Sequence, residues 1–198
     1  MVFVILVIFW ASVFSLILFK VKGGKLAQWA KLFRIITLVF SISFFTYWFI
    51  KKSSIGIVED SLSLQVINKL PQPLDFYVIN LNTHADSTKS FETKHIGKVR
   101  PEYYRIEHLK MERSDEYWVV GYLGKKNLVY FSQHSVPNKN IDQIIEVQNY
   151  INQSVRLSDT AKKQIDAYNY ENVKIGIWVA LDFLLMFLNL VLLIRSRK

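Results

Sequence analysis

Cysteine is absent from this chain of 198 residues. The absence excludes disulfide bridges, thiolate nucleophiles and cysteine-ligated metal sites. Glycine is sparse as well: neither Gly-Lys-Ser/Thr nor Gly-x-x-Gly follows the one adjacent pair, Gly23-Gly24, as it would in a phosphate-binding loop. No serine has the Gly-x-Ser-x-Gly context of a hydrolase nucleophile. We therefore expect a protein that is not an enzyme and uses no cofactor.

Residues that could ligate a metal or exchange protons are present, but they are dispersed. A metal site needs three or four converging ligands, and no two histidines have a local ligand spacing. The four histidines are His84, His95, His108 and His134. Acidic pairs such as Glu59-Asp60, Asp115-Glu116 and Glu107 with Glu112 lie in charged stretches, where we expect solvated carboxylates. We predict no metal site and no catalytic pair.

Long hydrophobic runs are what this sequence has in abundance, with 51% hydrophobic residues overall. The runs cover residues 1–19, 35–50 and 173–194. Each is about long enough for a helix to cross a hydrocarbon core of ~30 Å. No Lys or Arg precedes Lys20 and no small-x-small site ends the first run, so it does not resemble a cleaved signal peptide. We predict three transmembrane helices.

The net charge of +9 is placed at the ends of these runs rather than in a nucleic-acid groove. Between residues 53 and 170 there are 14 Lys or Arg and 14 Asp or Glu, so this region is neutral. The surplus of positive charge lies in the basic loop 20–34 and the tail 195–198. Lys51 and Lys52 lie at the other end of the second run and favour the opposite orientation only weakly. We predict a multi-pass protein with the N-terminus outside and the C-terminus cytoplasmic, anionic lipid at the basic loop, and no nucleic-acid partner.

The region 53–172 then forms an extracytoplasmic domain, which without disulfides is typical of a bacterial inner-membrane protein. Alternating apolar residues and turn signals predict six strands, so we expect a small β-rich, sandwich-like domain in an α+β membrane protein. The strands are expected at 61–67, 74–81, 92–99, 103–110, 116–123 and 127–132. After Pro137 a helical period predicts helices at about 141–155 and 159–172, the second leading into the third transmembrane helix with little interruption or with a kink near 169–172.

Two polar residues interrupt the third apolar run. Asp182 and Asn189 are seven residues apart and share one helical face, while Gly176 and Ala180 form a small-residue face on roughly the opposite side. A carboxylate at mid-bilayer costs ~2.5–3.5 kcal/mol on insertion scales and normally faces a partner or water. The first two apolar runs contain no Lys or Arg, so we expect any cation that pairs with Asp182 to come from another chain.

These features favour an accessory or assembly subunit of a larger bacterial envelope complex, which acts through protein–protein contacts of the outer domain and the transmembrane helices. Its expected partners are other integral membrane proteins and a periplasmic protein. Two alternatives stay open: a transport or energy-coupling subunit that uses Asp182, and a transmembrane sensor.

Overall fold

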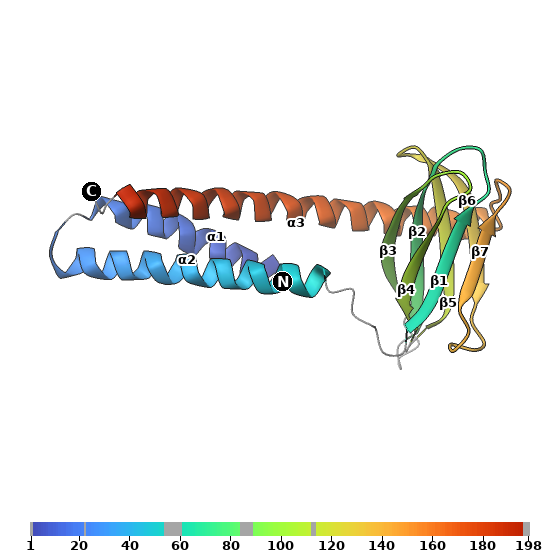
Figure 1. Cartoon of the computed structure of the whole chain (residues 1–198), viewed down its shortest axis with the longest axis horizontal. Helices are drawn as coiled ribbons and strands as arrows, with labels where there is room; N and C mark the ends of the chain where they lie inside the picture. The colour runs from blue at the N-terminus through green and yellow to red at the C-terminus, as the bar shows by residue number, and fades with distance from the viewer. Residues whose placement is uncertain (1, 22, 54–60, 84–88, 112–113, 196–198) are drawn as a thin grey trace. The chain divides into compact units, whose positions relative to one another are not determined.

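The computed structural model describes residues 2–21, 23–53, 61–83, 89–111 and 114–195. The chain divides into a helical unit, Met1–Ile55 with Tyr170–Lys198, and a β-rich unit, Gly56–Asn169. The protein is therefore of the α+β class, with helices and two β-sheets (Figure 1).

The helical unit contains α1 (Val2–Ile17) with a short 3-10 turn η1 (Leu18–Lys20), α2 (Gly24–Ser53) and the C-terminal part of α3 (Val155–Arg195). All three helices are long and apolar enough to cross a membrane. In Figure 1, α1 and α3 run in one direction and α2 runs against them. Their shared core is built around Ile5, Ile8, Phe45 and Val179.

The described residues of the β-rich unit form seven strands, and the predicted six are all present within a few residues of the expected bounds. The strands are β1 (Ser61–Asn68), β2 (Leu74–Thr83), β3 (Lys89–Val99), β4 (Tyr104–Lys110), β5 (Ser114–Leu123), β6 (Asn127–Ser135) and β7 (Gln143–Val147). They form a three-stranded sheet in the order β4-β1-β7 and a four-stranded sheet in the order β3-β2-β5-β6. The Gly124-Lys125-Lys126 hairpin is confirmed, since Leu123 pairs with Asn127 and Gly124 has the positive φ that such turns require.

The two sheets share one hydrophobic core. Leu62, Leu64 and Val66 of β1 are buried there with Phe76 and Val78 of β2. The opposite face of the four-stranded sheet, with Trp118 and Phe131, packs against Ala161 and Ile165 of α3. The unit therefore has three layers, because β2 and β5 are apolar on both faces and need cover on both.

The prediction of a helix at 141–155 is wrong, since residues 143–147 form strand β7. Alternate residues of β7 point inward: Ile145 and Val147 are buried, whereas Ile144 and Glu146 are exposed. β7 pairs in parallel with β1, with Leu64 opposite Gln143. This partner lies far away in the chain, so the local apolar spacing could fit a helix while the strand pairing decided the outcome.

Helix boundaries also differ from the sequence prediction. The nearly uninterrupted helix predicted through 159–172 and 173–194 is confirmed as the single helix α3, and only its start differs, at Val155 after Ser154. The Ser154 hydroxyl accepts a hydrogen bond from the Leu157 backbone N–H at 3.3 Å, as an N-cap does. Helix α2 begins at Gly24, so the amphipathic segment 26–34, which holds good helix formers and no helix breaker, is continuous with the predicted transmembrane run 35–50.

Candidate functional site

The side chain of Asn189, one of the two predicted polar residues, is hydrogen-bonded within the helical unit. Its side-chain oxygen accepts a hydrogen bond from the Ser15 hydroxyl at 2.8 Å. Its amide nitrogen donates to the backbone carbonyls of Ser12 at 3.1 Å and Leu185 at 3.0 Å. Ser12 and Ser15 are both buried, so Asn189 joins α3 to α1 through a polar contact inside an apolar bundle. Asn189 therefore has its partners in this chain.

Asp182 has the opposite character. Its side chain is fully buried, with 0% exposed, beside the core of the helical unit. Neither carboxylate oxygen has a hydrogen-bond partner among the residues that the structure describes. The two residues predicted to share one polar face are therefore both buried, but only Asn189 is satisfied. A buried polar group without a partner is destabilising, so its presence needs a reason other than stability.

The helical unit also buries a cation that lies outside the predicted apolar runs. Arg34, which the sequence placed in the basic loop 20–34, lies in α2 and is only 4% exposed. One guanidinium nitrogen donates to the backbone carbonyl of Ser15 at 3.2 Å, and the group lies 5.1 Å from the ring centre of Phe19. The early start of α2 is the physical reason, because it carries Arg34 into the helix packing. Arg34 does not contact Asp182, whose carboxylate has no partner among the described residues, so the origin of a cation for Asp182 in another chain stays a prediction.

The small-residue face of α3 is not used inside the chain. Gly176 and Ala180 are both exposed, and a Cβ added at Gly176 would meet no atom within 4 Å. Val173, Ile177 and Leu184 on the same face are exposed as well. Of the two predicted faces of α3, the polar one is buried within the chain and the small one is open.

Two histidines of the β-rich unit lie in separate polar pairs, whereas the buried Asn80 Oδ1, Tyr117 hydroxyl and Tyr122 hydroxyl have no hydrogen-bond partner among the described residues. His95 Nε2 lies 2.7 Å from an Asp75 oxygen, and His134 Nε2 lies 2.7 Å from the Ser132 hydroxyl, with burial lowering the pKa of His134. Among the described residues no three His, Asp or Glu side chains gather as metal ligands. His84, Glu59, Asp60 and Glu112 lie outside the described residues.

Those acidic side chains singled out by the sequence that the structure describes also have partners. Lys94 lies 2.6 Å from Glu107, and Lys139 lies 3.0 Å from Asp115. The Glu116 carboxylate accepts hydrogen bonds from Trp118 at 2.7 Å and from Gln133 at 2.6 Å. Each carboxylate thus contacts a cation or a hydrogen-bond donor rather than a second acid.

The outer face of the three-stranded sheet is open and partly apolar. Gln65 of β1 pairs with Ile106 of β4 on one side and with Ile144 of β7 on the other. Directly paired residues point to the same face of a sheet. Ile106 is 51% exposed and Ile144 is 61% exposed, and the next row adds Tyr104 at 58%. We name these three residues with Ile67 and Gln65 the open face.

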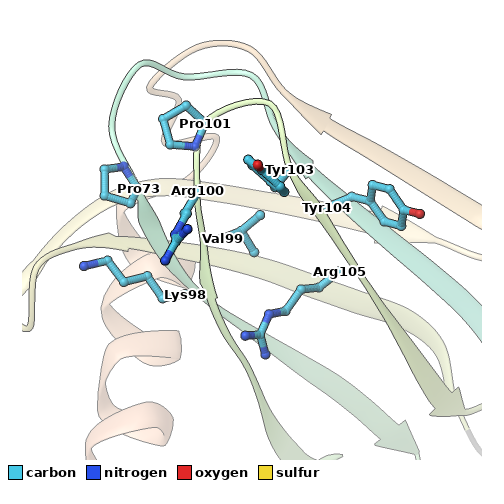
Figure 2. Close-up of a pocket in the computed structure, with 8 residues that line it drawn as sticks. All are labelled: Pro73, Lys98, Val99, Arg100, Pro101, Tyr103, Tyr104 and Arg105. Carbon is cyan, nitrogen blue, oxygen red and sulfur yellow. The ribbon is translucent and has the colours of Figure 1, made fainter.

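A groove borders this face at the turn between β3 and β4 (Figure 2), and it encloses about 700 Å³. Its cationic side chains are Lys98, Arg100 and Arg105. Its apolar and aromatic lining comes from Pro73, Val99, Pro101, Tyr103 and Tyr104. Tyr104 belongs to both the groove and the open face, so the two surfaces are continuous.

The sequence reasoning found Asp182 and Asn189 but not the groove or the open face. The signals were present as two Pro-containing turns and the Tyr103-Tyr104-Arg105 run. Only the pairing of β4 with β1 and of β2 with β3 brings these turns together.

Comparisons with known proteins add no identification. No protein-family model matches the chain, and no curated protein matches it. A solved structure described as "Trapped Toxin" is similar to part of the chain, with a TM-score of 0.24 and 17% sequence identity. The similarity covers 39% of this chain and 19% of that chain. A likeness this weak carries no functional information, so the function proposed below rests on the residues themselves.

Proposed function

We propose that the protein is a non-enzymatic accessory or assembly subunit of a larger membrane complex in the bacterial inner membrane. Its three helices cross the membrane with the N-terminus outside and the C-terminus in the cytoplasm, which leaves the sandwich-like β-rich unit in the periplasm. It acts by binding other integral membrane proteins through this unit and through its helices.

The open face is the observation that carries this proposal. The larger sheet has a second apolar face too, but α3 covers it. On the smaller sheet, Tyr104 and Ile106 of β4 and Ile144 of β7 are left about half exposed on the two strands that flank β1. Apolar and aromatic side chains gathered on one surface are typical of the centre of a protein–protein interface. A partner that covered them would complete the layering of the unit.

The open small-residue side of α3 supports a second contact, within the membrane. Gly176 and Ala180 allow a close helix approach of the small-xxx-small kind, and they are exposed in the helical unit. The basic segment before the apolar part of α2 exposes Lys25, Leu26 and Trp29, a combination that suits anionic lipid at an interface.

Co-purification of the tagged full chain in a mild detergent tests the proposal. Ile106→Asp and Ile144→Asp place a carboxylate in the open face, and each is expected to remove the accompanying membrane proteins identified by mass spectrometry. Val155→Asp is the matched control, because Val155 is 70% exposed at the start of α3, where an acid suits the helix dipole. Retention of the same partners by both open-face variants would overturn the proposal.

The unpartnered carboxylate of Asp182 favours one second candidate, a transport or energy-coupling subunit. Asp182→Asn and Asp182→Leu separate the two functions. If Asn is tolerated and Leu abolishes co-purification, Asp182 serves as a hydrogen-bonding group in assembly. If Asn abolishes function while the complex stays intact, ionisation matters and the transport function is correct.

The proposed orientation has its own test. A reporter that is active only in the cytoplasm, fused at Lys126 in the β5–β6 hairpin, should be inactive. Activity of that fusion would reverse the topology.

A further inference from the structure

The β3–β4 groove is prearranged by a single buried residue, Asn68. The Asn68 side-chain amide donates to the backbone carbonyls of Gln72 at 2.9 Å and Val99 at 3.0 Å. Its side-chain oxygen accepts from the Leu70 N–H at 3.1 Å. One side chain thus fixes the turn after β1 and the end of β3, which form two walls of the groove.

The backbone of Asn68 holds the third wall. Its N–H donates to the Tyr103 carbonyl at 3.0 Å, and its carbonyl accepts from the Glu102 N–H at 2.7 Å. Glu102 has a φ of 64°, a left-handed conformation that is unfavourable for a residue with a side chain. Such strain persists only where surrounding bonds enforce it, and it is concentrated at binding sites. The turn is therefore held rigidly in a shape that the sequence does not prefer.

The same arrangement leaves the cations of the groove without counter-charges. The two nearest acids in sequence are bound elsewhere: Glu102 lies 2.7 Å from Lys69, an ion pair that raises the pKa of Lys69, and Glu107 lies 2.6 Å from Lys94. Asp75, which lies opposite Lys98 in the sheet, contacts His95 instead. Among the described residues no carboxylate forms an ion pair with Lys98, Arg100 or Arg105. The groove therefore carries a net positive charge.

Arg105 is also held in place. One guanidinium nitrogen donates to the Ile96 carbonyl at 3.0 Å. Gly97 makes room for it, since a Cβ at Gly97 would lie 2.9 Å from that nitrogen, and the φ of 99° suits glycine alone. The guanidinium is therefore positioned before any ligand arrives, which lowers the entropy lost on binding.

We propose that this groove binds an extended acidic peptide segment of a partner protein. The inference rests on the proposed function, because it names the chemistry by which the partner of the adjoining open face is recognised. The three cations line the groove from β3, from the β3–β4 turn and from β4, which suits a chain with several carboxylates better than one ion (Figure 2). The Pro73, Pro101 and Tyr103 walls need apolar contact as well, which a peptide supplies and a bare phosphate does not.

The strand edge beside the groove is closed, so the peptide does not extend the sheet. Lys94 of β3 donates to the His108 carbonyl of β4 at 3.0 Å, and Arg105 of β4 donates to Ile96 of β3. These side chains occupy backbone acceptors that an added strand would use. Recognition therefore takes place in the groove through side-chain cations and aromatic contacts.

A fluorescence anisotropy titration tests the inference. The signal comes from a labelled six-residue peptide of alternating Glu and Pro, to which the full chain in detergent is added. This peptide stays extended over about 19 Å and carries three side-chain carboxylates. It should bind, and the matched peptide with Gln in place of Glu should not. Arg100→Gln and Lys98→Gln are each expected to weaken binding about tenfold.

The control variant Lys125→Gln/Lys126→Gln removes two charges from the β5–β6 hairpin and should change binding less than twofold. Equal weakening by the control, or no binding of the Glu-Pro peptide, would refute the inference. If the protein instead binds phosphatidylglycerol vesicles or a heparin fragment, and Arg100→Gln removes that binding, the ligand of the groove is a lipid or a glycan and the peptide inference is wrong. Partners that persist in co-purification while the peptide fails would leave the proposed function standing and remove only this inference.

Discussion

Asn68 offers the sharpest test of how the β-rich unit is held together. It is fully buried at the end of β1 and makes three side-chain hydrogen bonds to backbone groups of two separate turns. Asn68→Ala deletes all three without changing any apolar contact of the core. The backbone N–H of Leu70 and the carbonyl of Val99 lose the partner that the asparagine supplied.

The magnitude follows from these three bonds. Each buried hydrogen bond contributes about 1 kcal/mol net, and a polar group left unsatisfied costs about as much or more. We therefore expect Asn68→Ala to lower the free energy of unfolding of the unit by about 3 kcal/mol. Since every 1.4 kcal/mol is a factor of about ten, amide hydrogens of β1 and β3 should exchange roughly 100-fold faster through the open state.

Hydrogen exchange with mass spectrometry on the full chain in detergent measures this directly. Asn127→Ala is the matched control, because Asn127 is exposed at the first position of β6 and its substitution should leave exchange in β1 and β3 unchanged. If amide hydrogen exchange in β1 and β3 accelerates less than tenfold in Asn68→Ala, then water or backbone relaxation replaces the hydrogen bonds that the Asn68 side chain made. Asn68 would then not be what fixes the groove.

Three further predictions follow from buried residues. Asp182→Leu should stabilise the helical unit by about 2 kcal/mol in detergent unfolding, because the carboxylate has no hydrogen-bond partner among the described residues; destabilisation would reveal a bond in solution. Ala161→Leu should lower the free energy that protects backbone amides of α3 before residue 170 from hydrogen exchange by about 1–3 kcal/mol, since Ala161 is fully buried against the larger sheet. Unchanged protection would mean that a cavity beside Ala161 accommodates the larger side chain. Burial lowers the pKa of His134, so its contribution to stability is present above pH 6.5 and is lost as the pH falls below that value, where the unfolded chain binds the proton more readily. His134→Gln should flatten this part of the acid unfolding profile, and an unchanged profile would assign the slope to other groups.

The local spacing of apolar residues was enough to predict strands β1 and β2 and how many of their faces are buried. Residues 61–67 alternate between apolar and polar, and the observed burial of β1 alternates in the same way. The run 74–81 is apolar on both faces, and β2 is indeed a central strand. The same reasoning failed at 141–155, where isoleucines fit a helical period and only the partner strand β1 made Gln143–Val147 a strand.

For the candidate site residues, too, the sequence identified what is local and missed what depends on packing. The sequence identified Asp182 and Asn189, because a polar residue in an apolar run stands out without any tertiary information. It assigned both to one polar interface, yet packing gives Asn189 partners on α1 and leaves Asp182 without one. Arg34 was expected at the end of the basic segment 20–34, and only the packing of α2 against α1 shows that its side chain is buried.

The amino-acid sequence by itself determined three helices long and apolar enough to cross a membrane, six of the seven strands, and the absence of recognisable catalytic motifs. These properties follow from composition and short-range periodicity, which do not depend on which segments meet. The tertiary structure alone decided which apolar surfaces are covered, with α3 on one sheet and nothing described on the other. It also brought Asn68, Glu102 and Arg105 together from separate strands and turns, because a groove is formed by long-range strand pairing and not by any one stretch of chain.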